Sequence, residues 1–242
     1  MTPRTILLVG TLDTKGPEYA FVRDAVRARG HRTMLVDIGV LGDPFVMPDV
    51  SADDVARAAG TDLASLRTRA DRGHAVDAMQ RGAAALLPAW YAAGRFDGAI
   101  GLGGGGGTTM IATAMRTLPV GVPKVIVSTM GAGDTSPYVG VKDLTLMYSV
   151  VDIAGLNPLS RRILGNAAGA ICGMVEALDA DDRVGAVVAI GGVDVPDGHR
   201  AAAPRQLEAR RRPARARPGR GLDRHRPAGH DRRRDPLRRN PR

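Results

Sequence analysis

Five consecutive glycines, residues 103–107 (the glycine run), stand between two apolar segments in the sequence GLGGGGGTTM. Without side chains, backbone N–H groups can approach a bulky anion closely, and a helix that begins just after the run adds N–H groups and a favourable dipole. Threonine hydroxyls at the start of that helix are further donors. We therefore interpret the run as a phosphate-binding turn, not a flexible linker, formed by Gly103, Gly104, Gly105, Gly106, Gly107, Thr108 and Thr109.

A second candidate segment, TLDTKG at residues 11–16, combines hydroxyls, a carboxylate and an ammonium. Lys15 could bind a phosphate as a point charge, and Asp13 could hold Mg²⁺ or a ribose hydroxyl. Thr11 and Thr14 supply the hydroxyls. The same residues also fit a solvated turn closed by an Asp–Lys ion pair, so this segment alone supports both interpretations.

A third candidate segment is STMGAGDTSPYVG at residues 128–140. Gly131 permits close backbone approach, and the neighbouring polar side chains could contact the rest of a nucleotide. This combination favours a binding loop over a plain turn. The polar candidates are Ser128, Thr129 and Asp134.

Two well-known nucleotide motifs do not fit. Walker A requires G-x-x-x-x-G-K-[ST], which neither the glycine run nor GTLDTKG provides. A dinucleotide fingerprint, G-x-G-x-x-G, belongs in the first strand-to-helix turn, and here that turn reads GTLDTKGPE, although Asp37 suitably ends the second predicted strand. One enzyme alternative stays open, because the glycine run also resembles the GGGS pyrophosphate loop of iron-dependent alcohol dehydrogenases, which use NAD.

The metal ligands of such a dehydrogenase are not evident in the sequence. Those enzymes need several histidines and an aspartate, whereas the first 199 residues contain only His31, His74 and His199. We predict that His31 and His74 lie on the surface. No Ser-His-Asp or Cys-His set stands out, so no catalytic residue or metal ligand is assigned, and whether the protein is an enzyme stays open.

Hydrophobic periodicity predicts alternating strands and helices. Buried strands are expected at residues 4–10, 33–39, 96–103, 124–129, 144–150 and 184–192. Helices are expected at residues 16–30, 51–60, 62–93, 108–118 and 157–179. This order predicts an α/β fold with a doubly wound, mostly parallel, Rossmann-like sheet. All three candidate segments follow strand ends, where open α/β sheets bind ligands.

The net charge of +9 comes from the end of the chain. Residues 200–242 hold 16 of the 34 basic residues, all arginine, and four acidic residues, which leaves residues 1–199 with a net charge of −3. With three leucines as its largest apolar residues, this tail is predicted to be disordered. An arginine-rich arm could bind nucleic acid. Its abrupt shift to Arg, Ala, Pro and Gly without lysine instead favours a frameshifted, non-native end.

The sequence also allows a prediction of the cellular location of the protein. No segment approaches the roughly 20 apolar residues of a membrane span, and the N-terminus lacks the pattern of a signal peptide. We therefore predict a cytoplasmic protein that does not interact with membranes. The single cysteine, Cys172, excludes an internal disulfide.

Four segments resemble the uncharacterised bacterial and plant family related to the tomato tobamovirus-resistance protein: GTLDTKGPEYAFVRD, GRFDGAIGLGGGGGTT, VPKVIVSTMGAGDTSPYVGVKDLTLMYSVVDIAGLN and SRRILGNAAGAI. The similarity runs in order from about Thr5 to Ile190. It implies two Rossmann-like α/β halves, ATP bound by the first half, and a homodimer, but no particular reaction. The resemblance places phosphate contacts at residues 103–109 and nucleotide contacts at residues 11–15 and 128–134. The last range includes Met130 and Gly131.

The chain departs from that family in two places. Its glycine run is unbroken where the family usually has a serine, and an arginine-rich tail follows Gly191 where the second half should begin. We therefore predict an ATP-binding α/β domain at residues 1–195 and, at residues 196–242, a frameshifted remnant of the second half. The expected function is Mg²⁺-dependent ATP binding that acts through binding or assembly.

Overall fold

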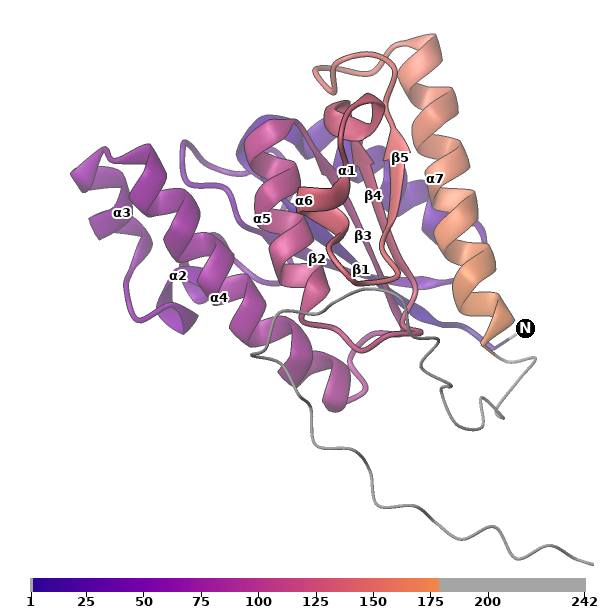
Figure 1. Cartoon of the computed structure of the whole chain (residues 1–242), viewed down its shortest axis with the longest axis horizontal. Helices are drawn as coiled ribbons and strands as arrows, with labels where there is room; N and C mark the ends of the chain where they lie inside the picture. Colours follow the sequence, from indigo (N-terminus) through magenta and orange to yellow (C-terminus); the bar gives the residue numbers. More distant parts are fainter. Residues whose placement is uncertain (1, 179–242) are drawn as a thin grey trace, which may run out of the picture. The chain divides into compact units, whose positions relative to one another are not determined.

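The computed structural model describes residues 2–178, which contain a five-stranded sheet covered by helices (Figure 1). The strand order is β2-β1-β3-β4-β5, and every neighbouring pair is parallel. This confirms the predicted doubly wound α/β fold, since the order reverses between β1 and β3. The strands are β1 (Thr5–Gly10), β2 (Arg32–Asp37), β3 (Gly98–Gly103), β4 (Lys124–Ser128) and β5 (Thr145–Tyr148).

Two layers of helices cover the sheet. Helices α1 and α7 pack against one face, while α2, α4 and α5 pack against the other. The helices are α1 (Leu12–Ala28), α2 (Ala52–Ala58), α3 (Leu63–Arg69), α4 (Arg72–Ala92), α5 (Gly105–Arg116), α6 (Ser136–Val139) and α7 (Pro158–Ala177), with a 3₁₀ helix η1 at Thr129–Ala132.

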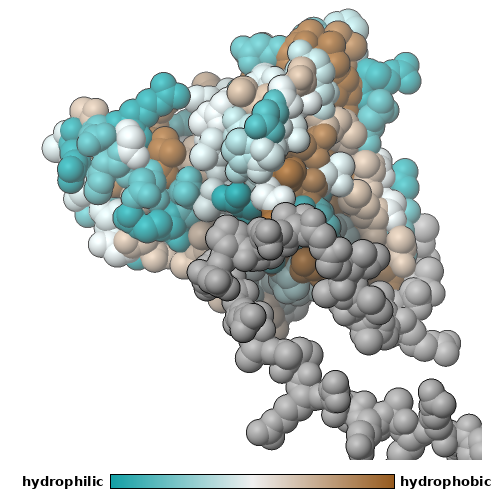
Figure 2. All heavy atoms as spheres, in the orientation of Figure 1, coloured by the Kyte–Doolittle hydropathy of each residue, from teal (hydrophilic) through white to brown (hydrophobic). Residues whose placement is uncertain are grey.

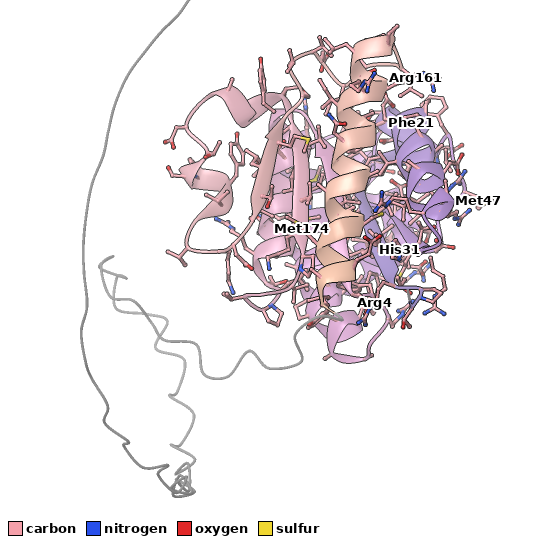
Figure 3. The ribbon with its side chains drawn as sticks, turned by 90° about the vertical axis from the view of Figure 1, so that its right-hand side faces the viewer. Arg4, Phe21, His31, Met47, Arg161 and Met174 are labelled. Atoms are coloured by element: carbon pink, nitrogen blue, oxygen red, sulfur yellow. The ribbon has the colours of Figure 1, made fainter. Side chains whose placement is uncertain are left out.

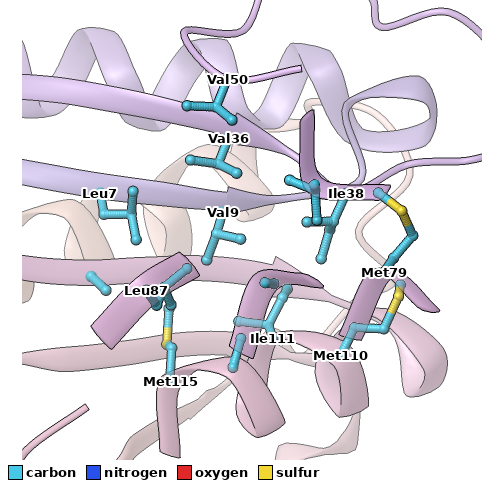
Figure 4. Packing of buried hydrophobic residues seen from close by; sticks show 14 of the residues in the cluster. Leu7, Val9, Val36, Ile38, Val50, Met79, Leu87, Met110, Ile111 and Met115 are labelled. Atoms are coloured by element: carbon cyan, nitrogen blue, oxygen red, sulfur yellow. The ribbon is translucent and has the colours of Figure 1, made fainter. Parts of the chain in front are cut away.

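The strands are apolar throughout because both of their faces are buried. In β1, Ile6 and Leu8 point to the α1 and α7 layer, whereas Leu7 and Val9 point to the α4 and α5 layer. Figure 4 shows the hydrophobic cluster between the sheet and the α4 and α5 layer, in which Val9 lies close to Val36 and Ile111. A side-chain period of two thus fills two cores at once, which explains the continuous apolar runs in the sequence.

Helix α7 crosses its face of the sheet beside α1 (Figure 3). Near its start, the Arg161 guanidinium lies over the Phe21 ring, 5.3 Å from the centroid. Near its end, Glu176 accepts a hydrogen bond at 3.0 Å from the Nε2 of His31, whose Nδ1 accepts the Arg4 backbone N–H. His31 is buried, so its predicted surface position is wrong: α7 covers a residue that local sequence placed after a helix end.

Two helix starts differ from the sequence prediction. Helix α1 begins at Leu12, four residues early, but its backbone breaks at Lys15 (φ −130°, ψ 22°), just before the predicted start at Gly16. Helix α5 begins at Gly105, so three residues of the glycine run form its first turn. Glycine's poor helix propensity suggested a loop there, and packing of the following apolar face outweighs that preference.

The two central strands separate beyond Val9, and a tyrosine fills the gap. Strand β1 pairs with β3 only as far as Val9 with Gly101. The Tyr19 hydroxyl donates to the Val9 carbonyl at 2.6 Å and accepts the Leu102 N–H at 2.7 Å. Burial of this ring raises the pKa of its hydroxyl, which stays neutral. Tyr19 therefore replaces the missing strand pairing at the point where the sheet opens.

Substitution of Tyr19 by phenylalanine is expected to lower the free energy of unfolding by about 2 kcal/mol, because two buried backbone groups lose their partner. Urea denaturation followed by circular dichroism measures this loss. Tyr138→Phe is the matched control, since within residues 2–178 no partner of the Tyr138 hydroxyl is present. Equal stability of the two variants would show that Tyr19 acts through its ring alone.

Strand β5 forms one edge of the sheet and leaves apolar side chains exposed. Figure 2 shows apolar residues at the surface over β5 and the loop that follows it. Tyr148, in β5, and Val150, in the loop, are exposed, and Val150 adopts a positive φ of 63°, which is unusual for a β-branched residue. Within residues 2–178, no helix has the length and apolar character needed to cross a bilayer.

Some predictions fall outside the described residues. The strand expected at residues 184–192, the arginine-rich tail, and the domain boundaries at residues 195 and 196 all lie beyond residue 178. They stay predictions.

Candidate functional site

A cavity of about 260 Å³ opens at the carboxyl ends of β1 and β3, where the strand order reverses. Crossover connections leave β1 and β3 in opposite directions here, which creates a crevice in open α/β sheets. The cavity is bounded by the starts of α1, α4 and α5 and by the loop after β2. Its lining residues are Thr11, Asp13, Thr14, Lys15, Ile38, Val40, Leu41, Arg72, Val76, Met79, Gly104, Gly105, Gly106, Gly107 and Met110.

Four glycines of the glycine run line this cavity, and the five glycines differ in how much space a Cβ atom would have. A Cβ on Gly103 would lie 2.5 Å from the Thr108 nitrogen, so this glycine is needed for packing at the end of β3. On Gly104, Gly105 and Gly106, a Cβ would meet nothing closer than 3.8 Å, and on Gly107 nothing within 4 Å. None of the five has a positive φ. Neither packing nor backbone conformation therefore explains the four glycines that line the cavity.

The N-terminus of α5 is open toward the cavity. The first N–H groups of a helix have no acceptor inside it, and within the described region no side chain caps this end. The start of α1 differs, because the Asp37 carboxylate accepts the N–H groups of Leu12 at 3.0 Å and Gly39 at 2.8 Å. The cavity thus has one uncapped helix N-terminus suited to an anion.

Asp37 is engaged inside the fold. It is buried at the end of β2, and burial raises the pKa of its carboxyl, although the two backbone hydrogen bonds act in the opposite direction. In a dinucleotide-binding Rossmann domain, an acid at this place would face a ribose. Here the carboxylate holds the first turn of α1 and is absent from the cavity wall.

Asp13 combines burial with an unused acceptor. Its Oδ2 accepts the N–H groups of Leu41 at 2.7 Å and Gly42 at 3.2 Å, which ties the loop after β2 to α1. Its Oδ1 is buried and has no hydrogen-bond partner. A buried carboxylate oxygen without a partner is unfavourable unless a ligand supplies a donor or a cation. Asp13 lines the cavity, while its Oδ1 lies close to Gly39 in the loop after β2.

Lys15 lines the cavity but already has a partner. Its Nζ donates to the Ile153 carbonyl at 2.5 Å, and on the same helix the Glu18 carboxylate accepts the Gly155 N–H. Both side chains hold the loop between β5 and α7 against α1. Thr11 and Thr14 share a hydrogen bond of 2.8 Å between their hydroxyls at the cavity wall.

The third predicted segment, residues 128–134, lies beside the glycine run but not in the cavity wall. A Cβ on Gly104 would lie 3.8 Å from the Thr129 hydroxyl, and one on Gly105 would lie 3.9 Å from the Met130 sulfur. Thr129 and Met130 are therefore neighbours of the glycine run, whereas the exposed Asp134 accepts the Ser136 N–H in a local turn. Gly131 packs against the Tyr148 backbone.

Two hydroxyls of the predicted site serve the scaffold. Thr108 and Ser128 are buried and hydrogen-bonded to each other at 2.7 Å, which joins α5 to the end of β4. The Thr108 hydroxyl also donates to the Gly103 carbonyl at 3.1 Å. Thr109 is exposed on α5, and its hydroxyl donates to the Gly105 carbonyl. These threonine hydroxyls thus have intramolecular partners, and the backbone N–H groups are the open donors.

Arg72 is a cavity residue that sequence reasoning missed. It is the first residue of α4, and a Cβ on Gly106 would lie 3.9 Å from its Nη2. Asp71, the capping residue before it, marks only a helix start in the sequence. No sequence signal relates this arginine to a glycine run more than 30 positions away, because the fold alone brings α4 next to α5.

The opposite wall of the cavity is apolar. Ile38, Met79 and Met110 lie close together there (Figure 4), and Val40 and Val76 extend the same surface. Flexible methionine side chains adapt readily to the flat face of an aromatic ring. The cavity therefore combines a polar end, suited to an anion, with an apolar end.

His31 lies away from the cavity, and the described residues contain no cluster of metal-ligating side chains. His31 is at the amino end of β2, the edge of the sheet opposite the cavity. Among residues 2–178, no three or more His, Cys, Asp or Glu side chains gather in a way that could hold a metal ion.

The fold and this cavity define a doubly wound, parallel α/β protein with a ligand-sized crevice at the switch point of its sheet. The chain belongs to the uncharacterised protein family UPF0261, whose N-terminal domain matches residues 4–180. This confirms the family resemblance seen in the sequence.

Relatives from bacteria and a plant share this region. A UPF0261 protein of Clostridium tetani is 46% identical over 173 residues, 72% of this chain and 43% of the relative. One from Rhizobium meliloti is 47% identical over 173 residues, covering 71% and 42%. The ToMV susceptible protein tm-1(GCR26) of Solanum lycopersicum is 34% identical over 189 residues, covering 72% and 25%. The chain thus spans less than half the length of these relatives.

Proposed function

We propose that this protein binds a nucleotide, ATP with Mg²⁺, in the cavity at the switch point. The observation that supports this most directly is the set of four glycines facing the cavity with neither a positive φ nor a packing neighbour. Their lack of side chains leaves the N–H groups at the start of α5 accessible. Phosphate oxygens are the acceptors that such a helix N-terminus prefers.

The charges around the cavity suit a polyphosphate. Lys15, near the start of α1, and Arg72, at the start of α4, add two cations to its wall. Asp13 is the buried carboxylate with a free oxygen, and Mg²⁺ in nucleotide sites is typically held by one or two carboxylates plus phosphate oxygens. Asp13 would therefore hold the ion, which would neutralise phosphate charge, without the protein cage that a resident metal needs.

The apolar wall provides a place for the base. Its aliphatic and methionine side chains could cover an adenine ring while the phosphates lie on α5. The dinucleotide alternative is less favoured, because Asp37 is engaged in capping α1 and does not face the cavity. A nucleotide bound through its phosphates accounts for both ends of the cavity.

Calorimetric titration of the full chain with ATP, ADP, NAD and adenosine, each with and without Mg²⁺, tests this proposal. We expect ATP to bind more tightly than ADP, adenosine to bind at least about 100-fold more weakly than ATP because it makes no charge-assisted phosphate contacts, and Mg²⁺ to strengthen ATP binding. Tighter binding of NAD than of ATP would favour the dehydrogenase alternative. No binding of any of the four would refute nucleotide binding.

A further inference from the structure

The cavity does not end at Arg72. A second hollow of about 340 Å³ lies between the loop after β2 and the junction of α3 with α4. Val40, Leu41 and Arg72 line both hollows, so the two are adjacent and Arg72 stands between them. A chain of phosphates that starts at α5 therefore has room to continue past the Arg72 guanidinium.

The position of Arg72 is unfavourable for stability alone. It occupies the first turn of the 21-residue helix α4, where the helix dipole repels a cation. Other arginines on this side of the molecule have partners: Arg57 pairs with Asp53, and Arg81 pairs with Asp77. Within residues 2–178, no hydrogen bond or ion pair of the Arg72 side chain is present. An unpaired cation kept at this end of a helix suggests a role toward an anionic ligand.

Lys15 is less free to take that role. Its ammonium donates to the Ile153 carbonyl, and moving it would release part of the loop between β5 and α7. Arg72 is exposed at the rim, and its five donors can bind a phosphate in a bidentate manner. The N–H groups at the start of α5 belong to the same helix as Met110, a residue of the apolar wall, whereas Arg72 also lines the second hollow. A phosphate chain would therefore place its proximal group on α5 and its distal groups at Arg72.

Resting on the nucleotide site proposed above, we infer that Arg72 is the residue that selects ligands with two or more phosphates. It binds the distal phosphates at the boundary between the two hollows. The adenosine end and the first phosphate are bound without it. Discrimination between ATP and AMP consequently depends on this one side chain more than on Lys15.

The test compares the binding of ATP, ADP, AMP and adenosine by the wild-type chain, Arg72→Gln and Arg72→Lys. For Arg72→Gln we expect the affinity for ATP to fall by about 10- to 100-fold, the effect of one charge-assisted, bidentate contact. The affinity for AMP should fall by less than about 3-fold, since its single phosphate stays on α5. Arg72→Lys should bind ATP more tightly than Arg72→Gln but less tightly than the wild type, because lysine keeps the positive charge but cannot bind a phosphate in a bidentate manner.

Two further measurements separate binding from folding. Without ligand, Arg72→Gln should melt at the wild-type temperature or slightly higher, because it removes a cation from a helix N-terminus. Arg81→Gln is the matched control on the same helix, and it should leave the affinities for all four ligands unchanged. Arg81 pairs with Asp77 and is not in the wall of either hollow.

The outcomes distinguish this inference from the proposed function. If the wild-type chain binds ATP and Arg72→Gln binds it equally well, the inference is wrong and the nucleotide site stands. Equal losses of affinity for ATP and AMP in Arg72→Gln would also overturn it, because Arg72 would then bind the proximal phosphate. If the wild-type chain binds none of the phosphate-bearing ligands, both proposals fail.

Discussion

Replacing Gly105 by valine is expected to weaken ATP binding by about 100-fold or more while the protein stays folded. A branched side chain at the first position of α5 would occupy the space through which a phosphate reaches the N–H groups. Loss of two charge-assisted hydrogen bonds at about 1.5–3 kcal/mol each gives this magnitude. Gly105 is exposed and a Cβ there would meet only the Met130 sulfur, at 3.9 Å. Calorimetric titration together with thermal melting measures both parts.

Gly173→Val is the matched control for this variant. Gly173 is also an exposed helical glycine, in α7, and a Cβ there would meet nothing within 4 Å. Both substitutions exchange glycine for a residue with somewhat better helix propensity, so neither should lower the melting temperature. ATP binding should be lost only in Gly105→Val. Undiminished binding by folded Gly105→Val would show that the glycines serve the turn and not a ligand.

The second large effect concerns stability at the opposite edge of the sheet. Lys124, the first residue of β4, is fully buried, and its Nζ lies 2.9 Å from the Asp143 carboxylate. The ammonium also donates to the carbonyls of Pro119 at 2.9 Å and Val122 at 2.6 Å. Asp143→Asn would leave this buried charge without its counter-ion. Because Asp143 itself is 40% exposed, we expect a loss of about 2–3 kcal/mol, less than for a fully buried pair.

This loss should depend on pH. Burial acts to raise the pKa of Asp143, but the hydrogen bonds from Lys124 and Gly121 and the lysine charge outweigh it, so the pKa lies below its ordinary value. A lowered pKa contributes stability above the unfolded value, near 3.9, and this contribution disappears as the pH falls through the folded value. Wild type and Asp143→Asn should therefore differ most near neutral pH and converge below about pH 4.

Urea denaturation at several pH values measures this difference. Asp77→Asn provides the control, since the Asp77–Arg81 pair is exposed on both sides and should contribute less than about 1 kcal/mol. Equal effects of the two substitutions would mean that solvent reaches Lys124 and that its burial does not matter.

The fold could be predicted from local patterns because its strands are buried on both faces. Of the six apolar runs expected as strands, the five within residues 2–178 are all present, including the short β5 at Thr145–Tyr148. The helix expected at residues 51–60 is present and begins with a Ser51–Asp54 capping box, and the helix expected at residues 16–30 ends before Gly30, which has a φ of 87°. The helix starts were less predictable, because α5 extends into three glycines whose propensity opposes a helix.

Only those residues of the candidate site that directly follow a strand in the sequence could be predicted. Residues 11–15 and the glycine run follow β1 and β3, and parallel strands bring both to one edge of the sheet. Residues 128–134 follow β4, one strand further along, which explains why they lie beside the cavity instead of in its wall. ATP as the ligand remains a proposal.

The sequence by itself thus determined the α/β class, the parallel strands and the edge at which polar segments gather, because these depend on periodicity and on residues close together in the chain. The tertiary structure decided which side chains are free. It engages Asp37 at the start of α1, ties Lys15 to Ile153 and buries Thr108 against Ser128. It also places Arg72 beside Gly106. Such choices depend on contacts between residues that are 20 to 140 positions apart, and no local pattern records them.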